Sequence, residues 1–193
     1  MTNWIHLCID MQRMFAEDTP WHVPWMAAVS SEIVELAGTY PERTIFTRFV
    51  PPRTAEAMPG MWKEYYKKWE MMTLDRMPND LVGLVPELRG FVPPARIFDK
   101  MTYSPWIDGR LHLELTRGHV DTLIVTGGET DVCVLTAVVG AVDLGYRVVV
   151  LKDAVCSGAD QTHDAALELL GRRFTLQVEI RTTADFLAAA GLP

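Results

Sequence analysis

The segment at residues 126–134, Thr-Gly-Gly-Glu-Thr-Asp-Val-Cys-Val, brings a thiol to a position where it can act as a nucleophile. It follows the apolar run Leu123–Val125 and precedes a helix-like run from Val132 to Leu144. Cys133 should therefore lie in the first turn of a helix, where four N–H groups lack intrahelical partners and the helix dipole is positive. Such a position lowers the pKa of a thiol and favours its nucleophilic thiolate. The two preceding glycines let the backbone bend sharply.

A carboxylate and an ammonium group are predicted to meet this thiol. Asp10 directly follows one apolar run, and the pair Asp99-Lys100 directly follows another. Because ligands of an open parallel α/β sheet bind outside the carboxyl ends of its strands, all three groups should share one rim. Each has a structural alternative: Asp10 as a turn former or helix cap, Lys100 as an exposed loop lysine, and Cys133 as a small buried hydrophobe. Their coincidence at one rim favours catalysis.

The elements that position these groups are apolar runs alternating with helix-like segments. The predicted strands are Ile5–Ile9, Thr44–Phe49, Ala95–Phe98, Thr122–Thr126, Arg147–Leu151 and Gln177–Arg181. The predicted helices are Trp25–Gly38, Met61–Met71, Leu81–Leu88, Gly109–Thr116, Asp131–Leu144, Asp160–Leu170 and Thr183–Ala190. This alternation predicts a three-layer, Rossmann-like α/β fold: a mostly parallel six-stranded sheet with helices on both faces. The 193 residues are expected to form a single domain, 1–193.

Composition narrows the class of partner. Hydrophobic residues make up 49% of the chain, which argues against disorder. A net charge of −7 disfavours nucleic acid and anionic membranes as partners, and no apolar run reaches transmembrane length. The three cysteines, at positions 8, 133 and 156, match no zinc or Cys-x-x-Cys spacing, and the N-terminus lacks signal-peptide features. We therefore expect a cytoplasmic protein that acts on a small molecule.

The chain resembles the isochorismatase-like cysteine hydrolases, a superfamily that includes nicotinamidases, N-carbamoylsarcosine amidase and ureidoacrylate-type amidohydrolases. The matching segments occur in the same order and at similar spacing over nearly the whole chain. They are Leu7–Gln12, Asp99–Ser104, Gly127–Val134 and Gly145–Ala154.

The resemblance implies an isochorismatase-like hydrolase fold and a catalytic triad of Asp10, Lys100 and Cys133. It also implies a cis peptide between Gly128 and Glu129, and an oxyanion hole formed by the N–H groups of Glu129 and Cys133. Chemistry supports these roles, because Lys100 would favour the thiolate by its charge. Asp10 could move a proton from the thiol to the leaving amine. The two N–H groups could stabilise the oxyanion.

One departure from the resemblance concerns metal binding. Nicotinamidases resemble one another in an Asp-x-His metal motif after the second strand, where this chain has Thr47-Arg48-Phe49. The five histidines are scattered and form no ligand spacing. The prediction is therefore no metal and no cofactor, and a substrate other than a pyridine carboxamide.

Four residues are predicted to contact substrate: Arg48, Trp21, Trp62 and Tyr103. Arg48 ends the second strand and could grip a carboxylate or ureido oxygen with two hydrogen bonds, or it could be held by a structural carboxylate such as Asp99. The aromatic residues follow loops at the rim and could wall a pocket. Trp62 also belongs to a helical stripe that ends at Trp69, for which ordinary packing is the favoured alternative to a lid or subunit interface.

The preferred function is a metal-independent cysteine hydrolase that cleaves a C–N bond of a small amide or ureido compound through a thioester. The alternatives are hydrolysis of a vinyl ether, as in isochorismatase itself, and non-catalytic binding of a small molecule. A redox role is disfavoured because no second cysteine lies nearby in sequence. A homo-oligomer, dimer or tetramer, is expected.

Overall fold

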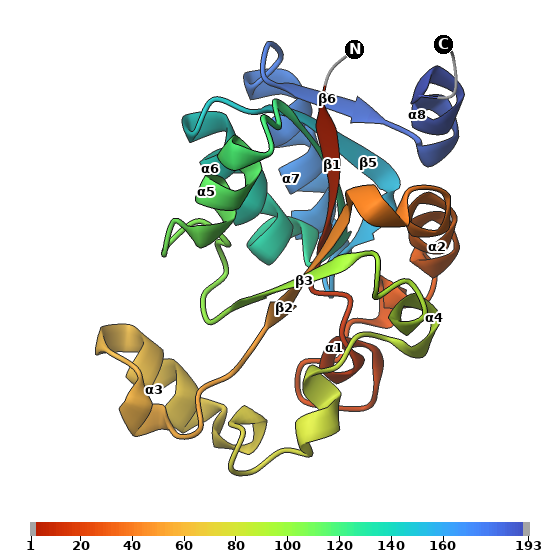
Figure 1. The fold of residues 1–193 in the computed structure, drawn as a ribbon. Helices are drawn as coiled ribbons and strands as arrows, with labels where there is room; N and C mark the ends of the chain where they lie inside the picture. The colour runs from red at the N-terminus through yellow and green to blue at the C-terminus, as the bar shows by residue number, and fades with distance from the viewer. Residues whose placement is uncertain (1–2, 191–193) are drawn as a thin grey trace.

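Six parallel strands form one sheet at the centre of the computed structural model, which describes residues 3–190 (Figure 1). The strands are β1 Trp4–Ile9, β2 Thr44–Phe49, β3 Arg96–Lys100, β4 Thr122–Gly128, β5 Arg147–Cys156 and β6 Val178–Arg181. Their order is β3-β2-β1-β4-β5-β6, so the chain starts at the middle, winds to one edge and then crosses to the other half. The direction of winding reverses between β1 and β4, which is where sheets of this kind bind ligands.

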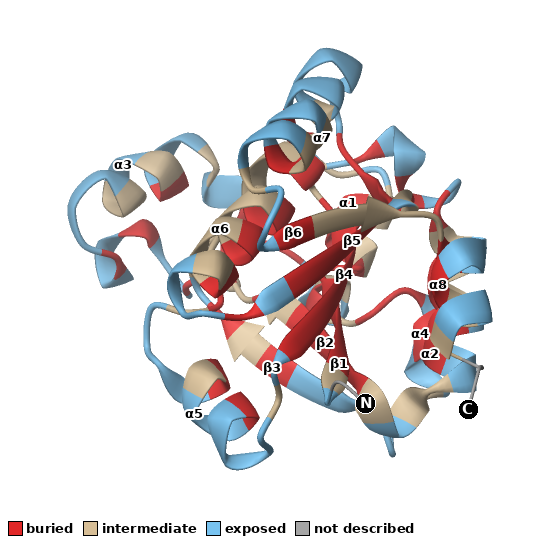
Figure 2. Ribbon diagram, turned by 90° about the horizontal axis from the view of Figure 1, so that it is seen from above, coloured by how far each residue is buried: buried red, intermediate tan, exposed pale blue. Residues whose placement is uncertain are grey.

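Helices cover both faces of the sheet. They are α1 Arg13–Ala16, α2 Ser30–Thr39, α3 Gly60–Lys68, α4 Pro86–Arg89, α5 Arg110–Arg117, α6 Leu135–Asp143, α7 Asp160–Arg173 and α8 Thr183–Ala190. Successive strand side chains point to opposite faces. Cys8 and Phe46 therefore pack in one core with α1, α2, α4 and α8, whereas Leu7 and Ile45 pack in a second core with α5, α6 and α7. Figure 2 shows the buried strands between the two helical layers. The predicted three-layer fold is confirmed.

The predicted helix Met61–Met71 ends at Lys68, and the one predicted over Asp131–Leu144 begins as a π-helical turn before Leu135. Two other predicted helices differ more. The segment predicted as a helix over Leu81–Leu88 is instead a 3₁₀ turn at Asn79–Val82 followed by the short helix α4. Pro86 explains the break, because it lacks an N–H and its ring would clash with the carbonyl four residues earlier. The helix predicted from Trp25 begins only at Ser30, after a separate 3₁₀ turn at Pro24–Met26.

The strands β3 and β5 extend beyond their predicted ends. The first runs on to Lys100, so this residue belongs to the strand rather than to the loop after it. The second runs to Cys156, because a bulge lets its later part pair with Gly127 and Gly128 of β4. No helix within residues 3–190 has the length and apolar character needed to cross a membrane.

Gly127 holds the end of β4 against β1. Its φ of +101° lies in a region that side chains rarely adopt, and a Cβ built there would lie 2.0 Å from the Ile9 carbonyl oxygen. Only a residue without a side chain can occupy this position next to the β1 backbone. The close approach brings the start of the Cys133 turn beside the residue that precedes Asp10.

We predict that Gly127→Ala lowers the free energy of unfolding by about 3 kcal/mol or more, because it adds a steric clash to an unfavourable φ. Gly145→Ala is the matched control, since Gly145 has a φ of +88° but no atom within 4 Å of a built Cβ. The control should cost only about 1–2 kcal/mol. Urea unfolding of both variants checks the difference, and equal losses would show that the contact with β1 is unimportant.

Candidate active site

A buried ion pair lies at the carboxyl end of the sheet. Lys100 Nζ donates to Asp10 Oδ2 over 2.6 Å, and the side chains are 3% and 1% exposed. The ammonium group also donates to the Thr102 carbonyl at 3.1 Å. Burial lowers the pKa of Lys100, but the Asp10 carboxylate outweighs it and raises that pKa above its ordinary value. The lysine is therefore held in its charged form.

The length of the lysine side chain makes this pair possible. Lys100 ends β3 and Asp10 follows β1, with β2 lying between them in the sheet. Neighbouring strands are about 4.8 Å apart, so the two residues are separated by about twice that distance. The Lys100 side chain spans the gap past Phe49 of β2, whose ring centroid lies 5.2 Å from Nζ.

Thr47 of β2 fixes the orientation of Asp10. The Thr47 hydroxyl donates to Asp10 Oδ1 at 2.6 Å and accepts from the Asp10 backbone N–H at 3.1 Å. Asp10 has a φ of +48°, an uncommon conformation that Asp tolerates better than most residues. One carboxylate oxygen is therefore bound by threonine and the other by lysine.

Cys133 lies in an irregular helical turn, Thr130–Val134, that precedes α6. The Glu129 carbonyl accepts hydrogen bonds from the N–H groups of Val132 and Val134, at 3.1 and 3.0 Å. In a regular α-helix this carbonyl would accept from Cys133, which is the residue passed over. The π-helical geometry therefore directs the Cys133 N–H away from this acceptor, as such turns often do at functional sites. The peptide bond between Gly128 and Glu129 is cis.

Side chains from α7 and from the residue that follows β5 anchor this turn. Asp131 accepts from the Ser157 hydroxyl at 2.5 Å and from the Thr162 hydroxyl. The Thr130 hydroxyl is within 2.9 Å of the His163 Nδ1 atom. The contact with Thr130 gives His163 a structural role, and together the three contacts fix the backbone that carries the thiol.

The Cys133 thiol is held in its protonated form, contrary to the expectation of a lowered pKa. The residue is only 7% exposed. Burial raises the pKa of the thiol well above its ordinary value, and the Asp10 carboxylate raises it further, whereas Lys100 lowers it. Burial opposes ionisation, and Lys100 already compensates the Asp10 charge, so it cannot also stabilise a thiolate fully. A base is therefore needed to activate this sulfur.

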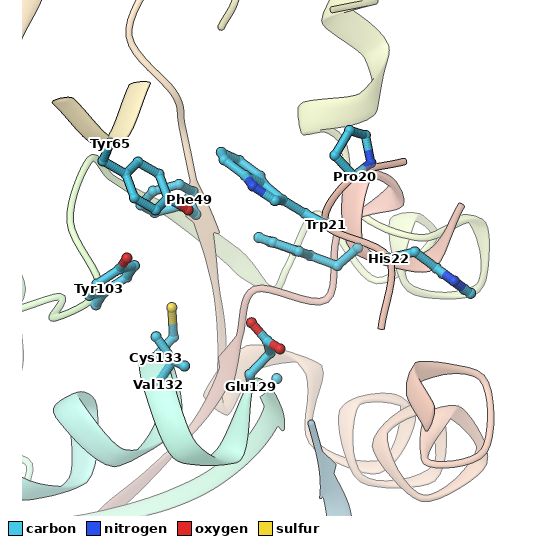
Figure 3. Close-up of a pocket in the computed structure, with 11 residues that line it drawn as sticks. Pro20, Trp21, His22, Phe49, Tyr65, Tyr103, Glu129, Val132 and Cys133 are labelled. Atoms are coloured by element: carbon cyan, nitrogen blue, oxygen red, sulfur yellow. The ribbon is translucent and has the colours of Figure 1, made fainter. Parts of the chain in front are cut away.

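The thiol faces a cavity of about 200 Å³ (Figure 3). Aromatic side chains form the largest part of the lining, and the rest comes mainly from the segment that carries the thiol. The lining residues are Phe15, Pro20, Trp21, His22, Phe49, Tyr65, Tyr103, Gly128, Glu129, Val132 and Cys133. Figure 3 shows the Glu129 carboxylate directed inward beside Cys133, and the His22 ring turned away.

Two of the four residues predicted to contact substrate line the cavity, and two do not. Trp21 and Tyr103 line the cavity. Trp62 lies behind it, with its ring centroid 4.8 Å from that of Tyr103. Trp62 therefore supports the wall rather than forming it, as the packing alternative for its helix proposed.

Arg48 is held by a carboxylate of the protein, which is the second of the two roles that the sequence left open. Its guanidinium donates to both carboxylate oxygens of Asp99, at 2.7 and 2.8 Å, and it is not among the lining residues. Because Phe49 lines the cavity and strand side chains alternate, Arg48 points to the other face of the sheet. The predicted grip on a substrate carboxylate therefore has no geometric support.

Sequence reasoning missed two aromatic lining residues and the side chain of Glu129, and it placed a third, Tyr65, in the aromatic stripe whose role it left open. Phe15 belongs to α1, a helix that was not predicted, and Phe49 was read only as the end of a strand. Tyr65 lies on α3, which projects from the body of the protein in Figure 1, and its side chain lines the cavity. Glu129 was considered only for its backbone N–H. The sequence signal that could have identified the Glu129 side chain is its position four residues before Cys133, directly before the turn that carries the thiol.

The second-strand position of the nicotinamidase metal motif holds no ligand set here. Thr47 binds Asp10, and Arg48 binds Asp99. Within residues 3–190, no three His, Cys, Asp or Glu side chains gather in a group able to hold a metal ion. These residues do not fit a metal of the nicotinamidase type.

Comparison with known proteins places this site in a family. The isochorismatase domain model matches residues 5–185. The chain is 30% identical over 111 residues to the isochorismatase family protein YwoC of Bacillus subtilis. The matched region covers 58% of this chain and 57% of YwoC. The matched region thus spans somewhat over half of that relative.

Solved structures share the fold. A cysteine hydrolase from Pseudomonas syringae superposes with a TM-score of 0.81 at 23% identity, covering 96% of this chain and 91% of that one. N-carbamoylsarcosine amidase from Thermoplasma acidophilum gives 0.74 at 16% identity, covering 94% and 97%. A pyrazinamidase/nicotinamidase from Streptococcus mutans gives 0.73 at 22%, covering 91% and 99%. The fold therefore does not separate amidases from nicotinamidases.

The arrangement of charges predicts how the thiol titrates. In the wild type, alkylation of Cys133 by iodoacetamide should have its pH midpoint above the ordinary thiol value of about 8.5. Asp10→Asn should lower this midpoint, because it removes a negative charge and leaves Lys100 beside the sulfur. Lys100→Met should raise it, because it removes the one nearby positive charge.

Mass spectrometry of the peptide that contains Cys133 measures the rate at each pH. Asp143→Asn, which makes the same chemical change at an exposed position on α6, should leave the midpoint unchanged. A midpoint that rises in Asp10→Asn or falls in Lys100→Met would contradict the assigned charges.

Proposed function

The chain belongs to the isochorismatase family, and from this we propose that it is a metal-independent cysteine hydrolase that cleaves a C–N bond of a small amide or ureido compound. The observation that carries the proposal is the Cys133 thiol, which faces a small cavity and whose pKa responds to the buried Asp10–Lys100 pair. A binding protein has no need for a base, a cation and a thiol at one point.

The first half of the proposed reaction forms a thioester. The Asp10 carboxylate accepts the thiol proton, and the sulfur attacks the carbonyl carbon to form a C–S bond. The N–H groups of Glu129 and Cys133 stabilise the resulting oxyanion. Protonated Asp10 then donates the proton to the leaving nitrogen, the C–N bond breaks, and the amine or ammonia departs.

The second half regenerates the enzyme. Asp10 accepts a proton from water, which attacks the thioester carbonyl. The C–S bond breaks, the sulfur recovers the proton as a thiol, and the acid product leaves. Throughout, Lys100 offsets the negative charge that moves between the Asp10 carboxylate and the sulfur. The raised pKa of the resting thiol supports the role of Asp10 as the base that removes its proton.

The choice of the amidohydrolase branch over nicotinamidase chemistry rests on the second strand. Thr47 and Arg48 replace the metal-binding motif and are engaged by carboxylates of the protein itself. The homo-oligomeric state and the cytoplasmic location stay predictions.

We predict that Cys133→Ala reduces hydrolysis by at least about a thousandfold without unfolding the protein, because it removes the nucleophile and leaves little space at a helix start. Ammonia release from a panel of small amides and ureido compounds measures the rate, and circular dichroism checks the fold. Cys8→Ala and Cys156→Ala are the matched controls and should retain most activity. Near-wild-type turnover by Cys133→Ala would exclude the thioester mechanism.

Removal of divalent metals is predicted to leave this rate unchanged, because the proposed steps use only side chains and backbone groups of the chain. Dialysis against a chelator, followed by metal analysis and the ammonia assay, provides the measurement. A loss of activity that zinc, iron or manganese restores would contradict the prediction and favour nicotinamidase-type chemistry.

A further inference from the structure

The cavity contains a carboxylate that the proposed reaction does not use. The Glu129 side chain lines it beside Cys133, and its Oε1 atom accepts only a 3.3 Å hydrogen bond from the Gly158 N–H among the described residues. Burial raises the pKa of this carboxyl group, which is the sign of a charge poorly compensated by its surroundings. A positive ligand beside it would favour its ionised form.

The basic residue that lines the cavity is His22, and Figure 3 shows its ring turned away. Neither Lys nor Arg occurs among the lining residues of the cavity as the structure describes them. The Lys100 ammonium group is bound to Asp10 and not to Glu129. Among the described residues that line the cavity, Glu129 is therefore the one acidic side chain, and no lysine or arginine accompanies it.

The walls opposite this carboxylate are aromatic. Trp21 connects the rings of Phe15, Phe49 and Tyr65, with centroid distances of 6.2, 5.9 and 6.0 Å. Tyr103 continues the wall from Phe49 at 6.2 Å. Faces of such rings attract cations, and aromatic walls with a carboxylate are typical of sites that bind ammonium groups.

We propose that this site selects small cationic compounds, with the Glu129 carboxylate as the residue that sets this specificity. This inference rests on the proposed function in one respect, that the ligand is the substrate. The substrate would then be an amide or ureido compound that also carries an ammonium group. The cavity volume of about 200 Å³ limits it to roughly the size of one ring. Substrates that carry carboxylates, including anionic vinyl ethers, would be repelled by Glu129.

The test compares three ligands of nearly equal shape and different charge: benzylammonium, benzyl alcohol and benzoate. Calorimetric titration of the wild-type protein at neutral pH should give a Kd for benzylammonium at least about tenfold lower than for benzyl alcohol, with benzoate the weakest. Benzylammonium should also slow alkylation of Cys133, which locates it in the cavity. Glu129→Gln should bring the first two Kd values to within about threefold of each other.

Glu35→Gln is the control for net charge, because it neutralises an exposed carboxylate on α2 and should preserve the preference. Equal binding of benzylammonium and benzyl alcohol by the wild type would overturn the proposal, as would a preference that survives Glu129→Gln. These titrations need no turnover. Failure to hydrolyse any amide would therefore refute the proposed reaction without affecting the conclusion on charge selectivity.

Discussion

The buried ion pair between Asp10 and Lys100 is the interaction on which the rest of the site depends. Two unit charges are almost fully removed from water, so each requires the other, and loss of one partner typically costs about 3–5 kcal/mol. The pair also links β1 to β3 across the end of β2. Its geometry follows from strand spacing, from the length of one lysine side chain and from the hydroxyl of Thr47.

The same pair explains the resting state of the sulfur. Burial raises the pKa of the Cys133 thiol, the Asp10 carboxylate raises it further, and Lys100, which is already bound to Asp10, lowers it too little to offset them. In its resting state the site thus contains a protonated Cys133 thiol beside the Asp10 carboxylate, rather than a preformed thiolate. Buried thiols of this kind are less exposed to adventitious oxidation, because the thiolate is the reactive form.

The fold and the meeting of three groups could be predicted because both follow from local sequence signals. Apolar runs fix the strands, and parallel topology brings residues after their ends to one rim. The direction of the Cys133 pKa shift could not be predicted, since burial and the distance to Asp10 are tertiary properties. The role of Arg48 depended on which face of β2 it occupies, and only the pocket position of Phe49 settles that. The lining by Phe15 came from the short helix α1, which the sequence did not predict, whereas the helix that carries Tyr65 was predicted but its position over the cavity is a tertiary property.

The projecting helix α3 belongs to the long excursion between β2 and β3, residues 50–95, and none of Asp10, Lys100 and Cys133 comes from it. Its contribution to the cavity is the side chain of Tyr65, supported by neighbouring aromatic residues. Divergence in that excursion can therefore reshape the entrance while the reacting groups stay fixed by the sheet. Proteins that descend from one ancestor could thus change their substrate specificity through this surface insertion while they keep the same reacting groups.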